Sequence, residues 1–284
     1  MTTHRERAPI ADALDRYRER KGTSFHVPGH KNGRIYESHS QVAGMLLDAM
    51  RVDVTEISEM DDLFQPEGII QEAQELAADC FCADESFFLV GGSTAGNLAL
   101  ILTVCATPGD MLLVQRNVHK SILNGLKLAG ARVVFLRPEF DQHSGLAIAP
   151  SLNTIRSALD AYPEAKGLMV TMPNYYGMGS DLRPIAEACH ERGLPLLVDE
   201  AHGAHYGHHP ELPRSALACG ADGVVQSTHK MLAAMTMGAM LHVQGDRLDR
   251  GLLRQRLSMI QSSSPSYPLM ASLDLARRLL HTQG

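Results

Sequence analysis

Two short segments of the chain place reactive side chains directly after apolar runs. One run, Leu194–Val198, is followed by Asp199 and, three residues later, by His202. The other, Gly223–Gln226, leads through two hydroxyl residues and a histidine to Lys230. A lysine can hold the aldehyde of pyridoxal phosphate as a Schiff base, and an aspartate can keep the pyridine nitrogen protonated so that the ring accepts electrons. We therefore predict a pyridoxal phosphate enzyme in which Lys230 and Asp199 are catalytic.

A glycine-rich turn at residues 91–97 adds a possible anion site. Its sequence, Gly-Gly-Ser-Thr-Ala-Gly-Asn, follows an apolar run and opens a helical pattern. Glycines allow the backbone to approach a ligand, and the hydroxyls of Ser93 and Thr94 stand beside free N–H groups at a helix N-terminus, which favours an anion. A plain N-cap explains the same residues. The turn also lacks the lysine of a nucleotide P-loop and the spacing of a dinucleotide fingerprint, so both interpretations stay open.

Other side chains near these segments are candidates for contact with the cofactor. Ser227 and His229 are spaced so that they can reach a phosphate while Lys230 reaches an aldehyde. The apolar run Met231–Met235 favours a buried lysine, and burial lowers the pKa of a lysine and suits covalent chemistry. His119 follows another apolar run and offers a ring that can stack on a flat cofactor. A capping or solvent-facing histidine is the alternative for His119.

Four histidines close together, His202, His205, His208 and His209, invite comparison with a metal site. They lie in sequence rich in glycine and proline, without the regular spacing of a helix or strand. No cysteine or paired acid completes a tetrahedral set of ligands. We therefore predict no metal.

Composition limits the class of protein. The chain has 284 residues, is 44% hydrophobic and carries a net charge of −6. That length is enough for one large core, or for one domain and a fragment. The negative charge argues against nucleic acid or an acidic membrane surface as the main partner. No apolar run is long enough to span a membrane, and the basic N-terminus lacks the apolar segment of a signal peptide.

The cysteines are scattered and odd in number. Cys80 and Cys82 are too close together for the usual zinc knuckle spacing. We predict reduced, buried thiols, which are typical of the cytoplasm. The five are Cys80, Cys82, Cys105, Cys189 and Cys219.

The elements that position these residues alternate between strand and helix. Short, continuously apolar runs are typical of strands buried on both faces. Alternation of such strands with helices predicts an α/β fold with a mostly parallel seven-stranded sheet and helices on both faces. Ligands bind such sheets beyond the carboxyl ends of the strands, where every motif above falls. The predicted strands are Ser86–Val90, Met111–Gln115, Arg132–Leu136, Gly167–Thr171, Pro195–Asp199, Gly223–Ser227 and Ala239–Val243, and the predicted helices are 68–82, 95–106, 119–130, 151–161, 183–192 and 265–281.

The chain resembles the pyridoxal phosphate-dependent Orn/Lys/Arg decarboxylases over nearly its whole length. The resemblance rests on several motifs that occur in one order, which makes it specific. They include Phe-His-Val-Pro-Gly-His-Lys near the N-terminus, Asp-Glu-Ala-His-Gly-Ala-His after the fifth predicted strand, and Gln-Ser-Thr-His-Lys after the sixth. The matching segments are 25–33, 60–63, 66–68, 91–97, 117–121, 199–205, 226–230 and 261–267.

This resemblance implies a fold and a set of roles. The fold is an aspartate aminotransferase-like (fold type I) large domain, at residues 66–284 after an N-terminal segment 1–65, and it works as a dimer or larger homo-oligomer. Lys230 forms the covalent link, Asp199 holds the pyridine nitrogen and His119 stacks on the ring. Ser262 reaches the phosphate in the neighbouring subunit. The implied cofactor-binding residues are Ser93, Thr94, Ala95, His119, Asp199, His202, Ser227, His229, Lys230 and Ser262.

The resemblance also implies an activity, the decarboxylation of arginine, lysine or ornithine to the corresponding amine. Family members continue into a further C-terminal domain that closes over the site, whereas this chain stops at Gly284. Another pyridoxal phosphate-dependent lyase or transaminase, or a catalytically silent cofactor-binding subunit, therefore remains open. A distal cation on the substrate needs an acid, and the candidates are Glu56, Glu59, Asp61 and Asp62.

Overall fold

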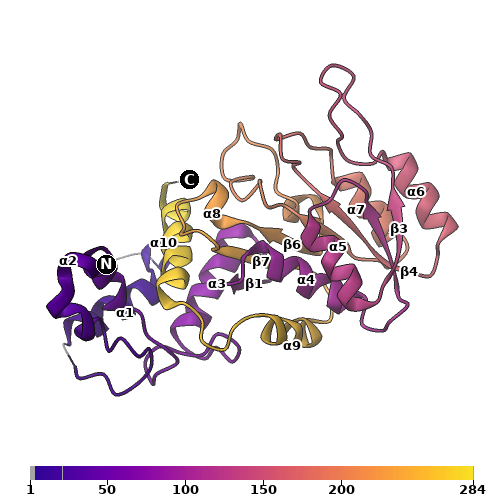
Figure 1. The fold of residues 1–284 in the computed structure, drawn as a ribbon. Helices are drawn as coiled ribbons and strands as arrows, with labels where there is room; N and C mark the ends of the chain where they lie inside the picture. The colour runs from indigo at the N-terminus through magenta and orange to yellow at the C-terminus, as the bar shows by residue number, and fades with distance from the viewer. Residues whose placement is uncertain (1–3, 21, 284) are drawn as a thin grey trace.

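A single seven-stranded sheet organises the protein (Figure 1). The structure is a computed structural model that describes residues 4–20 and 22–283. The strands lie in the order β1-β7-β6-β5-β4-β2-β3, and only β7 runs antiparallel to its neighbours. All seven predicted strands are present, and their ends differ from the prediction by at most two residues. Their bounds are β1 Glu85–Leu89, β2 Met111–Gln115, β3 Arg132–Leu136, β4 Ala165–Thr171, β5 Leu196–Asp199, β6 Gly223–Gln226 and β7 Ala239–Val243.

Helices cover both faces of this sheet, as the sequence predicted. One face packs against α4, α5 and α9 through residues such as Leu100, Ile122 and Leu257. The other packs against α1, α3, α6, α7 and α10. The sequence did not predict α1, α2, α8 or α9. The bounds are α1 Pro9–Glu19, α2 Ser40–Met50, α3 Ile69–Phe81, α4 Gly92–Val104, α5 Lys120–Ala129, α6 Leu152–Ala161, α7 Arg183–His190, α8 Thr228–Met231, α9 Arg250–Ile260 and α10 Tyr267–Gln283.

The central strands are apolar on both faces because both are covered. Every residue of β2, β5, β6 and β7 is buried. The edge strand β3 is more exposed. Continuous apolar runs, rather than alternating ones, are what such strands require.

Helix α4 lies unusually close to the sheet where it begins. A Cβ atom on Gly96 would lie 2.8 Å from the Leu89 side chain and 2.9 Å from that of Val225. Only glycine permits this approach. It brings the start of α4 beside the carboxyl ends of β1 and β6, which is the edge where the predicted site lies.

The N-terminal segment is tied to the last helix through buried charges. Asp274 and Arg277, both fully buried in α10, are joined at 2.6 Å. The Ile10 N–H donates to Asp274 at 3.0 Å, and Arg277 donates to the backbone carbonyls of Arg5 and Arg7. Each buried charge is therefore paired, as burial requires. The division into segments 1–65 and 66–284 stays a prediction.

Two composition-based expectations can be compared with the structure. Four of the five cysteines are buried, whereas Cys82 is exposed because it lies at the C-terminal end of α3 in a left-handed turn. Within the described part of the chain, no helix combines the length and the apolar character needed to cross a bilayer.

Candidate active site

Lys230 lies at the carboxyl-end edge of the sheet, in the single-turn helix α8 that follows β6. Its Nζ is 3.3 Å from Nε2 of His202, which lies in the loop after β5. Lys230 is exposed, so the expectation of a buried lysine is wrong. The apolar run after it is only partly buried: Met231, which ends α8, and Met235 are 40% and 54% exposed, whereas Leu232 and Ala234 pack against the core.

The pKa of His202 is lowered at this edge, which favours its neutral form. Burial is the largest cause, and Lys230 and His119 lower the pKa further. A neutral imidazole can accept a hydrogen bond from the amino group of a lysine. The Lys230–His202 contact therefore places a hydrogen-bond acceptor beside the amine that would attack an aldehyde.

Asp199 ends β5 in a buried chain of polar side chains that reaches His119. Its Oδ2 accepts a hydrogen bond from Asn97 Nδ2 at 3.0 Å. The same amide group lies 3.0 Å from Ser121 Oγ, which is 2.9 Å from His119 Nδ1. The second Asp199 oxygen accepts from the Ala201 N–H at 3.2 Å. Both donors to the carboxylate are neutral.

This environment suits a cationic ligand at Asp199. The side chain is 2% exposed, and burial, the largest cause, raises the pKa of its carboxyl group. The hydrogen bonds from Asn97 and Ala201, and the charges of His119 and Lys230, oppose that rise. A buried carboxylate needs a cation to be stable. A protonated pyridine nitrogen would supply one, and Oδ1 of Asn97 is a second buried polar atom here without a partner among the described residues. The residues present therefore fit pyridoxal phosphate.

The glycine-rich turn faces the end of β6. Ser227 Oγ, which is buried, donates to Ser93 Oγ at 2.8 Å, so two of the predicted phosphate-binding hydroxyls lie together. Gly92 has φ +73, a conformation that glycine adopts readily. No side chain caps the first turn of α4 at Gly91. The hydroxyl pair and the uncapped N–H groups together make a suitable place for an anion.

Other predicted cofactor-binding residues lie around this cluster with different neighbours. Thr94 is exposed and Ala95 is buried, both in the first turn of α4. His119 is the exposed N-cap of α5 and accepts from the Ser121 N–H. His229 Nδ1 lies 2.9 Å from the Gly238 carbonyl, an interaction that fastens α8 to the start of β7. Contact of any of these residues with the cofactor stays a prediction.

Ser262 lies in an exposed loop between α9 and α10. Its hydroxyl forms a local turn with Ser264. Gln261, the residue before Ser262, accepts a hydrogen bond from the Val90 N–H at 2.8 Å. Val90 directly precedes the glycine-rich turn. The loop is thus fastened near the candidate phosphate site, and a role of Ser262 in a neighbouring subunit stays a prediction.

The acids proposed to bind a distal cation are partly committed to the fold. Asp61 accepts hydrogen bonds from the N–H groups of Asp62, Glu67, Gly68 and Ile70, which hold its pKa low against the effect of burial. Glu59 pairs with Arg20, and Asp62 accepts from the Phe64 N–H. Burial, and then repulsion by Asp62, raises the pKa of Glu56.

The histidine-rich loop packs against aromatic rings. His208 meets the edge of Phe81 at 5.2 Å, and His205 lies 4.8 Å from the Tyr206 ring. Among residues 4–20 and 22–283, no three His, Cys, Asp or Glu side chains are grouped so that they could hold a metal ion.

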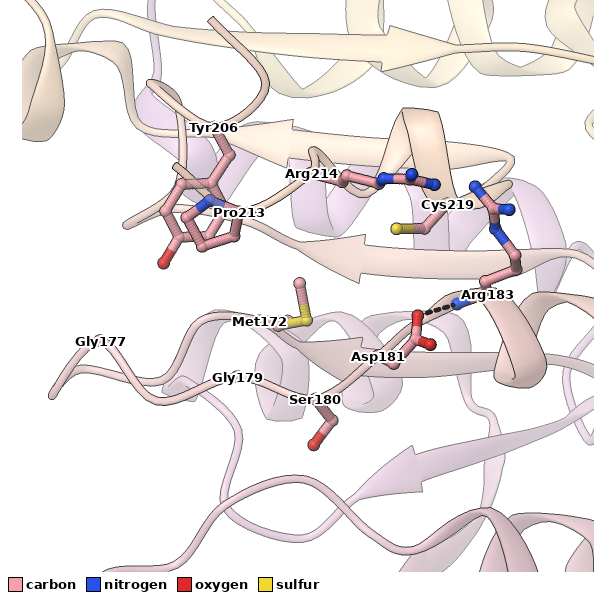
Figure 2. Close-up of a pocket in the computed structure, with 10 residues that line it drawn as sticks. All are labelled: Met172, Gly177, Gly179, Ser180, Asp181, Arg183, Tyr206, Pro213, Arg214 and Cys219. Atoms are coloured by element: carbon pink, nitrogen blue, oxygen red, sulfur yellow. Dashed lines mark hydrogen bonds between the residues drawn. The ribbon is translucent and has the colours of Figure 1, made fainter. Parts of the chain in front are cut away.

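A cavity of about 550 Å³ opens between the loop that follows β4 and the loop that precedes β6 (Figure 2). Arg183 and Arg214 lie toward one end, near Cys219, and Tyr206 lies toward the other. None of the predicted cofactor-binding residues lines it. The cavity is therefore separate from the predicted cofactor site.

Two functional features escaped residue-by-residue reasoning from the sequence. Asn97 was part of a motif but had no role, although it lies four residues after Ser93 and therefore on the same helix face. Glu200 and Gln226, each adjacent to a predicted site residue, form a buried hydrogen bond of 2.8 Å. The available signal was a polar side chain at the end of β6 and another directly after β5.

Comparisons with known proteins agree on one family. A model of the Orn/Lys/Arg decarboxylase major domain matches residues 8–284. The chain is 50% identical over 270 residues to the uncharacterised protein YaaO of Bacillus subtilis (strain 168), covering 95% of this chain and 56% of that protein. It is 39% identical over 277 residues to the arginine decarboxylase of the same organism, covering 97% and 56%. The chain thus spans a little over half the length of these relatives.

A solved structure gives the same fold. Lysine decarboxylase A from Pseudomonas aeruginosa superposes with a TM-score of 0.80 at 27% sequence identity. The match covers 96% of this chain and 40% of that one. The predicted α/β architecture with its mostly parallel seven-stranded sheet is confirmed.

Proposed function

This chain belongs to the Orn/Lys/Arg decarboxylase family, and we propose that it takes part in the pyridoxal phosphate-dependent decarboxylation of a basic amino acid to the corresponding amine and carbon dioxide. Pyridoxal phosphate is the cofactor of this family. The observation that carries the proposal is the Lys230 cluster, defined as Ser93, Asn97, Asp199, His202, Ser227 and Lys230. It brings together Lys230, which is hydrogen-bonded to His202, and the buried carboxyl group of Asp199, which has only neutral donors.

Each member of the Lys230 cluster has a distinct task in this proposal. Lys230 holds the aldehyde of the cofactor, Asp199 faces its ring nitrogen, and Ser93 with Ser227 binds its phosphate. The bound cofactor supplies a protonated conjugated ring that accepts the electron pair left when carbon dioxide departs. His202, whose pKa is lowered, accepts a hydrogen bond from Lys230 Nζ. Asn97 orients Asp199 through a 3.0 Å hydrogen bond. A carboxylate placed in advance opposite a developing charge stabilises the transition state most.

Arginine is the first substrate to test. The curated relative named as an arginine decarboxylase is 39% identical to this chain, whereas the solved lysine decarboxylase is 27% identical. Another lyase or transaminase reaction would use the same lysine and aspartate, and a silent cofactor-binding subunit would keep them without turnover. Family membership favours decarboxylation over both alternatives.

Assembly and location complete the proposal. The protein is a dimer or larger homo-oligomer in which Ser262 reaches the partner's phosphate site, since its loop is fastened beside the glycine-rich turn through Gln261. It works in the cytoplasm, where five unpaired cysteines would stay reduced.

The decisive experiment measures carbon dioxide release from arginine, lysine and ornithine by the protein reconstituted with pyridoxal phosphate. We expect release from at least one of the three, with arginine first. Borohydride reduction followed by peptide mapping should place the cofactor on Lys230. Binding without release would favour the silent subunit, transfer of the amino group without release would favour a transaminase, and a label on another lysine would refute the assigned site.

A further inference from the structure

A second buried polar chain crosses the opposite face of the strands that carry the Lys230 cluster. Ser86 Oγ in β1 lies 2.7 Å from His242 Nδ1 in β7, and His242 Nε2 lies 3.1 Å from Gln226 Oε1 in β6. Gln226 Nε2 donates to Glu200 Oε2 at 2.8 Å. Glu200 Oε1 accepts from the Ala216 N–H at 2.7 Å. The four side chains are all buried.

The hydrogen bonds of this chain run in one direction. Burial lowers the pKa of His242 to about 3, so its ring is neutral and has one donor and one acceptor nitrogen. The Ser86 hydroxyl donates to Nδ1, and Nε2–H donates to the Gln226 carbonyl oxygen. Gln226 then donates to Glu200. These hydrogen bonds therefore run from Ser86 toward Glu200, which accepts the last of them through Oε2.

Burial of the Glu200 carboxyl group is energetically unfavourable. It is fully buried, and burial raises the pKa of its carboxyl group to about 8, against the two hydrogen bonds that lower it. The ionisable groups that its charge reaches are Tyr206 and Cys219, neither of them a cation, and Asp199 precedes it in the chain. A buried acid without a cation lowers stability. Its presence therefore points to a role other than packing.

The position of Glu200 suggests that role. It lies two residues before His202, while its partner Gln226 lies four residues before Lys230. The bond to Ala216 closes the loop that carries His202, and the bond to Gln226 fastens that loop to β6. These two attachments hold together the segments whose side chains meet as Lys230 Nζ and His202 Nε2 at 3.3 Å.

We propose that Glu200 is a positioning residue of the active site, which sets the Lys230–His202 contact through its hydrogen bonds to Gln226 and Ala216. This inference rests on the proposed function. The side chain of Glu200 is hydrogen-bonded to Gln226 and Ala216, neither of which belongs to the Lys230 cluster. Small displacements of catalytic groups have large kinetic effects, and a shift of about 1 Å can cost roughly 100-fold in rate.

The test compares Glu200→Ala with a matched control, Asp222→Ala. Asp222 is a buried acid that joins the same two strands at their opposite ends, where it accepts from the Leu196 N–H at 2.8 Å. The readout is the visible absorption of the cofactor bound to Lys230, titrated over pH. We expect Glu200→Ala to lower the midpoint, because a displaced His202 no longer accepts a hydrogen bond from the protonated nitrogen. Asp222→Ala should lose stability but keep the midpoint.

An exchange variant separates hydrogen bonding from mere bulk. In Glu200→Gln/Gln226→Glu, the amide at position 200 accepts from Ala216 and donates to the carboxylate at position 226, which also accepts from His242. All bonds of the chain are thereby kept. We expect this variant to restore the midpoint of the absorption titration. It should also recover most of the roughly 10- to 100-fold loss in turnover that we expect for Glu200→Ala. If Glu200→Ala does not fold, Gln226→Leu, which frees the loop from the other side, replaces it.

The outcomes discriminate clearly. An unchanged midpoint in Glu200→Ala, or an exchange variant no better than it, overturns the positioning role while leaving the proposed function intact. An equal shift in Asp222→Ala also overturns it, because a general loss of stability would then explain the change. A wild-type protein that does not take up pyridoxal phosphate on Lys230 overturns the proposed function, and the inference with it.

Discussion

The two ends of strands β5 and β6 use buried acids in opposite ways. At the amino ends, Asp222 is bonded to His190 at 2.9 Å and to Arg247 at 3.3 Å, as well as to a backbone N–H. At the carboxyl ends, Asp199 has the neutral donors Asn97 and Ala201. A buried acid that a protein cation such as Arg247 already pairs serves the fold. Asp199, whose donors are neutral, lies at the edge where a bound cofactor would supply the positive charge.

The strongest challenge to this comparison is removal of the amine at the carboxyl-end edge. Lys230→Ala should abolish covalent attachment of the cofactor and lower carbon dioxide release by more than ~10³-fold, since the other groups cannot replace a nucleophile. Lys127→Ala, which removes an exposed lysine of α5, is the control and should keep full activity. Comparable loss in both variants would mean that Lys230 acts through the fold.

Asp199→Asn against Asp222→Asn tests the two acids directly. Asp199→Asn keeps the shape of the side chain but not its charge, so it should retain the cofactor and lose roughly 10²- to 10³-fold in turnover. Asp222→Asn should lower the free energy of unfolding by roughly 1–3 kcal/mol and leave turnover unchanged, because it weakens bonds remote from the site. Turnover and denaturant unfolding of both proteins would be measured, and a reversed pattern would contradict the comparison.

Close approach of α4 to the carboxyl-end edge predicts a smaller effect. Gly96→Ala places a methyl group within 2.9 Å of Leu89 and Val225, so α4 must shift. We expect a loss of about 1–3 kcal/mol in unfolding free energy and weaker cofactor retention. Gly44→Ala is the control: it lies in the helix α2 with nothing within 4 Å of the added Cβ, and it should gain about 0.5–1 kcal/mol. The unfolding free energies of both variants would be measured by thermal and denaturant unfolding. If Gly96→Ala and Gly44→Ala changed stability equally, α4 would not be packed tightly against Leu89 and Val225.

The sequence was most informative where the physical demand is simple. A strand covered on both faces must be apolar throughout, and this requirement located the central strands, including β5 with its terminal Asp199 and β6, which Ser227 follows. Polar residues directly after such runs could then be assigned to one edge. Residues Ser93 and Ser227, which are 134 positions apart, do meet there.

The sequence failed where an outcome depends on neighbours that are distant in the chain. The run Met231–Met235 is apolar, yet its two methionines are exposed while Leu232 and Ala234 pack against the core, so the run misled the prediction of a buried Lys230. Asn97 and Gln226 are neutral amides within apolar elements, and their partners lie on other strands or loops. Nothing in local spacing specifies such pairs, because they depend on which strands become neighbours.

The smallest expected effect concerns the charge of His202 at the carboxyl-end edge. Its pKa lies below the ordinary value of 6.5, first through burial and then through the charges of Lys230 and His119. The folded protein therefore binds fewer protons than the unfolded chain below about pH 6.5, so stability is present above that pH and declines as the pH falls through the folded pKa. Lys230→Met removes one of the two charges and should raise the pKa of His202 part of the way toward 6.5, since burial, the larger cause, remains. Titration of the His202 ring by NMR in both proteins measures this directly. A pKa that does not move would mean that the 3.3 Å contact is not maintained in solution, and a fall would contradict the assigned repulsion between the two groups.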